Sequence, residues 1–302
     1  MGLFSRRGTA APDDALPVLT RAQADRLRAL VLAELTEPGR PVPVDGGTMV
    51  LTARGAVQLG ELADRAAAHP EATWSDLVPR YLGAVLAAPS DLTDLDSVRD
   101  VLLPRLLPDR RDDAGARDDV GSPADGLLVR FALDLADRVE VLTDLAPLGG
   151  FAAVAPVAEA NLRRLPAPDH HVMGGTDGDP VLHAFVSDDF HGATRLLALD
   201  HVLETVGVQP PALGALVGVP DRHVLLVHPI TGADVVPAMT TLLGLTADRF
   251  AAQSQVQSGV ISPDVFHRDA TGNLLRVTAR GADGRPQVLV HGAFADVMAT
   301  IG

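Results

Sequence analysis

Four polar residues in the second half of the chain have the types and spacing to do chemistry. Asp188 and Asp189 precede His191 and Arg195, which are four residues apart and would share one face of an α-helix. Two acids beside a general base and a guanidinium suit acid–base catalysis or anion binding. We favour a structural interpretation, in which the acids cap a helix N-terminus and Arg195 binds back to them. We also expect His191 and Arg195 to be exposed together at the border of a functional surface.

Asn161 and Arg163 complete the candidate binding residues, and none of the six is assigned as catalytic. Asn161 interrupts the apolar stripe of a helix predicted over 153–165. A buried amide needs hydrogen-bond partners, so we expect Asn161 to tie a neighbouring strand or loop. Arg163 lies on the other side, near the helix C-terminus, where a positive charge is favourable.

The histidines raise the question of a metal site. Seven of the ten fall between residues 170 and 228. Histidine with carboxylate is a common ligand set for zinc or iron, yet no His-Glu-x-x-His motif occurs and the chain has no cysteine. We therefore expect no bound metal and no cofactor. The glycine-rich stretch 174–179 lacks the spacing of a phosphate-binding or calcium-binding loop and is predicted as a turn.

Composition excludes several classes of protein. Without cysteine there is no disulfide framework, thiol nucleophile or iron–sulfur cluster. All 25 basic residues are arginine, and the absence of lysine excludes a Walker A motif and a Schiff-base enzyme. The formal net charge of −14 argues against binding to nucleic acid or to an anionic membrane. No run of apolar residues is long enough to span a bilayer, and the first residues lack a secretory signal, so we expect a cytoplasmic protein.

The elements that must position these residues begin with a helix at Thr20. Thr20 and Gln23 form a capping-box pattern before an apolar stripe that ends at Pro38. A hairpin is predicted over 48–59 and a second helix from Thr73 to about residue 86. We expect residues 1–14 to form a disordered tail and 15–107 an N-terminal α+β region, within which the run 101–107 fits either helix or strand.

Residues 108–126 are rich in charge, glycine and proline, which predicts a mobile loop. The remainder, 127–302, reads as a C-terminal α+β region that either stands alone or continues the first. Here strand pairs alternate with helices, and strands that meet in hairpins favour antiparallel pairing. The predicted fold class is therefore α+β, with a mainly antiparallel sheet built from strand–strand–helix units and helices packed on the sheet.

Four stretches in series resemble the YtpQ-like family, a group of bacterial proteins of unknown function. They are FALDL (131–135), AEANLRRLP (158–166), DDFHGATRLL (188–197) and VGVPDRHVLLV (217–227). The order and spacing are similar from about residue 100 to 230. The resemblance implies no reaction, cofactor or substrate.

From these observations we expect a non-catalytic cytoplasmic protein that acts by binding a protein partner. One alternative is a hydrolase or metal-assisted enzyme that uses histidine and aspartate residues of the second half. Another is a small-molecule sensor in which the sheet cups a ligand. An enzyme needs Asp189, His191 or Arg195 to converge with another polar side chain in a cleft, so their geometry separates these alternatives.

Overall fold

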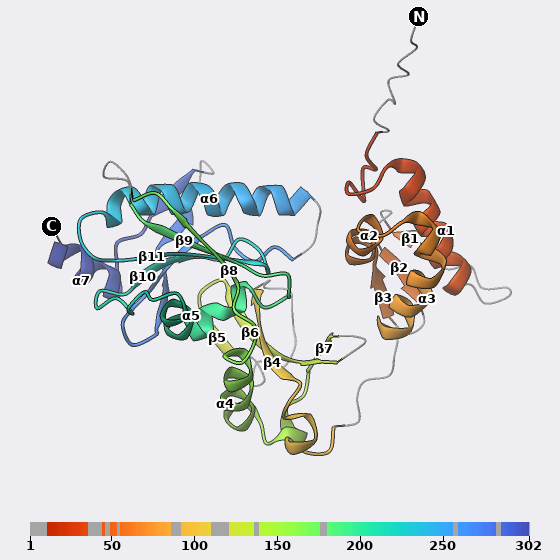
Figure 1. The fold of residues 1–302 in the computed structure, drawn as a ribbon, viewed down its shortest axis with the longest axis horizontal. Coiled ribbons are helices and arrows are strands. Elements are labelled where there is room, and N and C mark those ends of the chain that lie inside the picture. The colour runs from red at the N-terminus through yellow and green to blue at the C-terminus, as the bar shows by residue number, and fades with distance from the viewer. Residues whose placement is uncertain are drawn as a thin grey trace, which may run out of the picture. The chain divides into compact units, whose positions relative to one another are not determined.

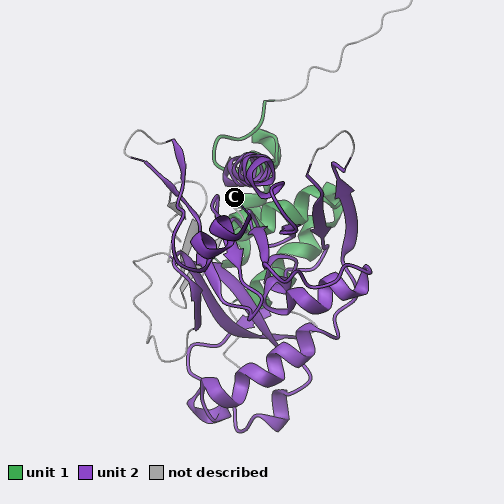
Figure 2. Cartoon of the chain, turned by 90° about the vertical axis from the view of Figure 1, so that its left-hand side faces the viewer, with its two compact units in different colours: residues 1–90, 255–258 green, residues 91–254, 259–302 purple. Residues whose placement is uncertain are grey.

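The computed structural model has helices and antiparallel sheets in two compact units (Figures 1 and 2). It describes residues 11–35, 44–45, 49–52, 55–85, 92–109, 121–135, 139–175, 180–255, 259–281 and 285–301. The first unit comprises residues 1–90 with 255–258, and the second comprises 91–254 with 259–302. The boundary therefore falls near residue 90 rather than at 107, because the strand that follows pairs within the second unit.

The first unit packs three helices together and carries a small antiparallel sheet. The helices are α1 (Arg21–Leu35), α2 (Leu59–Ala67) and α3 (Trp74–Val85), and the strands, in the order β1-β2-β3, are β1 (Val44–Asp45), β2 (Met49–Thr52) and β3 (Gly55–Gln58). Both capping-box bonds form: the Thr20 amide donates to Gln23 Oε1 at 3.0 Å, and the Gln23 amide donates to Thr20 Oγ1 at 3.4 Å. The buried side chain of Trp74 donates to the Ala66 carbonyl at 2.9 Å, which joins α3 to α2. The capped helix and the hairpin predicted for this region are confirmed.

The centre of the second unit is a six-stranded antiparallel sheet in the order β13-β12-β10-β11-β9-β8. Its strands are β8 (Asp169–Met173), β9 (Leu182–Val186), β10 (Ala215–Gly218), β11 (Val224–Pro229), β12 (Val265–Arg268) and β13 (Leu274–Arg276). Side chains that point to opposite faces of this sheet pack into two separate hydrophobic cores. Phe185 and Leu225 pack with the 3₁₀-helix η5 (Ala193–Ala198) and α5 (Leu199–Thr205), whereas Leu226 packs with α6 (Val235–Gln255) and α7 (Gly292–Ile301).

A second sheet in this unit contains the four strands β4 to β7. Its order is β4-β6-β5, with β7 also paired to β6; the strands are β4 (Leu102–Pro108), β5 (Gly121–Ala124), β6 (Leu127–Asp134) and β7 (Val139–Val141). The helix α4 (Phe151–Leu162) packs on it through Val154 and Ala158. The ambiguous run 101–107 is thus a strand, and Pro104 is tolerated there because β4 lies at the sheet edge. A short hairpin of β14 (Thr278–Arg280) and β15 (Pro286–Val288) completes the unit.

The segment 108–126, predicted as a mobile loop, has ordered ends. Pro108 ends β4, and residues 121–124 form β5, which pairs with β6. These ends are apolar or small enough to extend the sheet, so the loop prediction is wrong there. Residues 110–120, and the first ten residues of the predicted tail, lie outside the described part of the chain. The α+β class with mainly antiparallel sheets and helices packed against them is confirmed.

Candidate functional site

Arg195 holds the loop between β9 and η5 through contacts inside the protein. Its side chain is 4% exposed, and its guanidinium donates to both carboxylate oxygens of Asp189, at 2.9 and 2.8 Å. It also donates to Ser187 Oγ at 3.0 Å and to the Pro166 carbonyl at 2.9 Å. The expectation that Arg195 binds back to an acid is confirmed. The expectation that it is exposed to a partner is wrong, because Ser187, Pro166 and the loop itself enclose it.

The Asp189 carboxylate accepts a backbone hydrogen bond within a turn and does not cap the N-terminus of an α-helix. The His191 amide donates to Asp189 Oδ1 at 2.8 Å, within the turn that precedes η5. Burial on its own would raise the pKa of Asp189, but the hydrogen bonds from Arg195 and His191 outweigh it and lower that pKa. Asp189 is therefore an ionised carboxylate matched to one arginine. Its neighbour Asp188 is exposed.

His191 is buried, with 2% of its surface exposed, and does not share an open face with Arg195. Its Nδ1 lies 3.2 Å from the Pro104 carbonyl oxygen of β4. Because a carbonyl oxygen only accepts, Nδ1 carries the proton in this contact. Burial lowers the pKa of His191, so the ring is neutral near neutral pH. His191 and Arg195, which we predicted to be exposed together, are instead both buried and hydrogen-bonded within the protein.

Asn161 has the structural role predicted for it. Its side-chain Nδ2 donates to the carbonyls of Arg99 at 2.6 Å and Leu102 at 2.9 Å, which fixes α4 to the start of β4. Arg163 is exposed, and its guanidinium lies 3.8 Å from Glu159 one turn earlier. Of the six candidate residues, only Asp188 and Arg163 are exposed on the surface.

The loop that contains Asp189 interlocks with the turn between β10 and β11. The Ser187 amide donates to the His223 carbonyl at 2.9 Å, and the Ala193 amide donates to the Arg222 carbonyl at 3.1 Å. At Gly192 the two backbones approach so closely that any Cβ would collide with the His223 carbonyl group. The structure therefore brings together the two stretches 188–197 and 217–227, which are separated by α5 in the chain.

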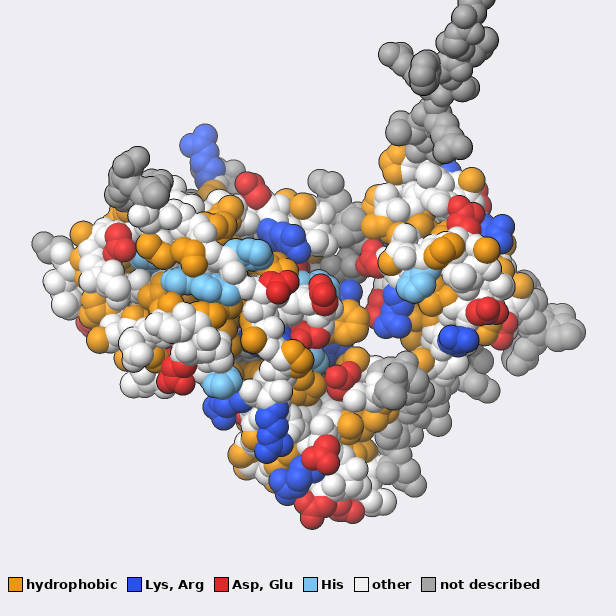
Figure 3. Space-filling model, in the orientation of Figure 1, with side chains coloured by type: hydrophobic (Ala, Val, Ile, Leu, Met, Phe, Trp, Pro, Cys, Tyr) orange, Lys and Arg blue, Asp and Glu red, His pale blue; other side chains and the backbone are white. Residues whose placement is uncertain are grey.

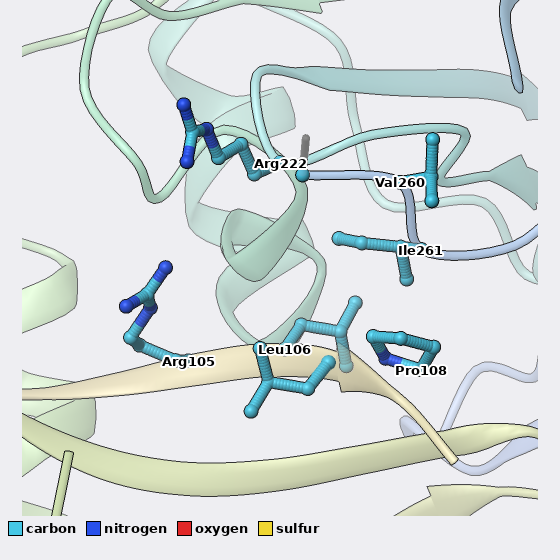
Figure 4. Close-up of a pocket in the computed structure, with 8 residues that line it drawn as sticks. Arg105, Leu106, Pro108, Arg222, Val260 and Ile261 are labelled. Carbon is cyan, nitrogen blue, oxygen red and sulfur yellow. The ribbon is translucent and has the colours of Figure 1, made fainter. Parts of the chain in front are cut away.

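Beside this junction opens a pocket of about 340 Å³, which we call the arginine pocket. It is lined by Arg105, Leu106, Leu107, Pro108, Arg222, Gly259, Val260 and Ile261. In Figure 4 the guanidinium groups of Arg105 and Arg222 lie toward one end, while apolar side chains such as Pro108 and Ile261 lie toward the other. The pocket is thus positive at one end and apolar at the other.

Arg222 is oriented by its neighbours. Its guanidinium lies over the ring of Phe190, 4.3 Å from the ring centroid, and its Nε donates to His223 Nε2 at 3.0 Å. Its backbone amide donates to the Gly259 carbonyl at 2.8 Å. These contacts fix the direction of the side chain, so little rotamer freedom remains to be lost when an anion binds.

Sequence reasoning missed both arginines. Arg105 lies in the run whose secondary structure was ambiguous, and Arg222 lies in what was interpreted only as a turn. No spacing rule links them, because one belongs to a strand of the smaller sheet and the other to a turn of the larger one. The only available signal was that Arg222 falls within a stretch that carries the family resemblance.

Five histidines lie in strands of the six-stranded sheet, namely His170, His171, His183, His228 and His267. His170 Nε2 lies 2.9 Å from His183 Nδ1, and the two rings stack with centroids 5.2 Å apart. Burial, followed by the charges of His170 and His228, lowers the pKa of His183. Figure 3 shows histidine side chains among hydrophobic ones over β8 and β9. Within the described residues, no three histidine, aspartate or glutamate side chains are grouped so that they could hold a metal ion.

Comparison of the chain with protein-family models, curated proteins and solved structures finds no match. Among the helices in the described part of the chain, none combines the length and apolar character that crossing a membrane requires.

Proposed function

We propose that the protein is a non-catalytic binding protein that recognises an acidic segment of a protein partner in the arginine pocket, with the cytoplasm as its expected compartment. The observation that carries this proposal is the placement of Arg105 and Arg222 at one end of an otherwise apolar pocket. A guanidinium presents paired N–H donors that match a carboxylate. The apolar end suits an aliphatic side chain next to the acid.

The alternative of an enzyme has less support. A general base or nucleophile must reach the substrate, and the acid, histidine and arginine that sequence reasoning singled out are engaged in internal hydrogen bonds. In the arginine pocket, the described lining residues supply guanidinium, backbone and apolar groups, but no carboxylate, hydroxyl or imidazole. Such a lining can bind and orient an anion, and it offers no group to accept a proton.

The net charge of the chain restricts the kind of acidic partner that we propose. The chain carries a formal charge of −14, so its long-range field repels polyanions. Attraction to the two arginines acts only over short range at physiological ionic strength. We therefore propose a short motif with one acid flanked by apolar residues, rather than a long acidic tract or a nucleic acid.

Peptide titration followed by NMR tests the proposal. The probes are a leucine–glutamate–leucine peptide and its leucine–glutamine–leucine counterpart, each blocked at both ends. We expect the acidic peptide to bind about tenfold more tightly, and Arg105→Gln to remove that preference. Arg222→Lys keeps the charge but not the paired donors, and should weaken binding partly. Arg99→Gln is the matched control, because Arg99 is exposed and does not line the pocket. Equal binding of both peptides, or a preference that survives Arg105→Gln in a folded variant, would overturn the proposal.

A further inference from the structure

A second cavity lies between α4 and the smaller sheet, and it differs from the arginine pocket in chemistry. Its volume is about 270 Å³. The lining residues are Pro104, Gly121, Ser122, Pro123, Val129, Phe131, Phe151, Ala155, Glu159 and Leu197. None of them lines the arginine pocket, so the two cavities are separate sites.

Two phenylalanine rings and one carboxylate make the lining of this cavity aromatic and negatively charged. Phe131 of β6 and Phe151 of α4 meet edge to face, with ring centroids 5.3 Å apart and planes at 61°. Phe131 is buried, whereas Phe151 is 36% exposed and reaches the surface. Glu159, two turns after Phe151 on α4, is the one charged side chain among the described residues that line the cavity.

We infer that this cavity binds a small hydrophobic amine in its protonated form. Aromatic rings attract cations through their negative faces, and the Glu159 carboxylate complements an ammonium group. The remaining lining is almost entirely apolar and suits a hydrocarbon body. The volume is slightly below the range usual for drug-sized ligands, so it fits a molecule with one ring and a short chain.

The exposed ion pair between Glu159 and Arg163 allows a ligand ammonium to replace Arg163 as the partner of the carboxylate. The Glu159 carboxylate lies 3.8 Å from the Arg163 guanidinium, and the two side chains are 44% and 48% exposed. An exposed pair at this distance contributes little to stability, so an incoming ammonium can compete with Arg163 at small cost. The overall negative charge of the chain raises the local concentration of cations as well.

Titration with three matched ligands tests this inference. The probes are 2-phenylethylammonium, the neutral 2-phenylethanol and the anionic phenylacetate, each added to the full chain and followed by NMR chemical shifts. We expect the amine to bind about tenfold more tightly than the alcohol, and phenylacetate to bind more weakly than either. Equal affinity for amine and alcohol, or no binding of the amine at millimolar concentration, overturns the inference.

Three single substitutions separate the contributions of the carboxylate, the competing arginine and the aromatic ring to ligand binding. Glu159→Gln should reduce the preference for the amine over the alcohol, because it removes the carboxylate and leaves only the two rings to attract the cation. Arg163→Gln removes the competing cation and should tighten binding of the amine only. Phe151→Leu should weaken both ligands, since it removes a ring from the wall. A preference for the amine that is undiminished in Glu159→Gln contradicts the inference. Because the arginine pocket shares no lining residue with this cavity, the peptide experiment is unaffected by either outcome.

Discussion

Arg195 and Asp189 form a two-point ion pair in which Nη1 lies 2.9 Å from Oδ1 and Nη2 lies 2.8 Å from Oδ2. The arginine is almost fully buried, whereas the aspartate side chain is 35% exposed. The pair closes the loop that interlocks with the turn between β10 and β11, and that turn supplies Arg222 to the arginine pocket. Arg195 is thus a structural residue that positions a proposed site without lining it.

Replacing Asp189 should destabilise the protein strongly. Asp189→Ala leaves the buried guanidinium of Arg195 without its counter-charge, and we expect the free energy of unfolding to fall by about 3 kcal/mol. Asp188→Ala removes the same charge from the exposed neighbouring position and should change it by less than about 0.5 kcal/mol. Urea denaturation of both variants measures the difference. If the two variants are equally stable, the ion pair does not hold the loop.

Acidification should weaken the fold through His191. Burial holds the pKa of this histidine below its ordinary value of 6.5, so the unfolded chain takes up a proton at a higher pH than the folded protein. The free energy of unfolding therefore falls as the pH drops through about 6.5. His191→Gln retains a donor for the Pro104 carbonyl but cannot titrate, and its stability should change less between about pH 7.5 and about pH 5.5. Identical pH dependence of the two proteins in urea denaturation would contradict this assignment.

Gly192 should tolerate no larger residue. A methyl group at this position collides with the backbone carbonyl of His223, which cannot move without separating the interlocked segments. We expect Gly192→Ala to lower the free energy of unfolding by about 3 kcal/mol. Gly232→Ala provides the control, because a Cβ there meets no atom within 4 Å. Thermal denaturation of the pair tests the prediction, and a Gly192→Ala variant as stable as Gly232→Ala would refute the close approach.

In the first unit, Asp13 should titrate at unusually low pH. The hydrogen bond from Arg28, with Nη2 and Oδ1 2.6 Å apart, lowers the pKa of Asp13 from 3.8 to about 2. Since the folded pKa is the lower one, the pair stabilises the protein above about pH 4, by about 2 kcal/mol, and this contribution is lost as the pH falls toward 2. NMR titration of the Asp13 carboxyl measures the pKa directly. Arg28→Gln should return it toward 3.8, and a pKa unchanged by that substitution would exclude Arg28 as the cause.

Short-range sequence patterns were enough to predict several helices and strands. The capping box at Thr20 and Gln23 marked the start of α1 because both of its hydrogen bonds lie within four residues. Short apolar runs in β9 and β11 indicated strands, and short connections indicated antiparallel pairing, from which the α+β class followed. These signals depend on neighbours in the sequence, so they are readable without a structure. Pro104, by contrast, left its segment ambiguous, since only the position of β4 at a sheet edge makes a proline acceptable.

What the sequence determined by itself is therefore the fold class, the start of α1 and the need of Asn161 for hydrogen-bond partners. The tertiary structure decided which polar residues are buried and which lie together. Periodicity places His191 and Arg195 relative to their own segment, but burial depends on what covers them, and the contacting residues Pro104 and Pro166 come from other parts of the chain. Arg105 and Arg222 reach one pocket because β4 and the turn after β10 are both hydrogen-bonded to η5. That proximity arises from long-range packing of two sheets, which no local pattern of residues encodes.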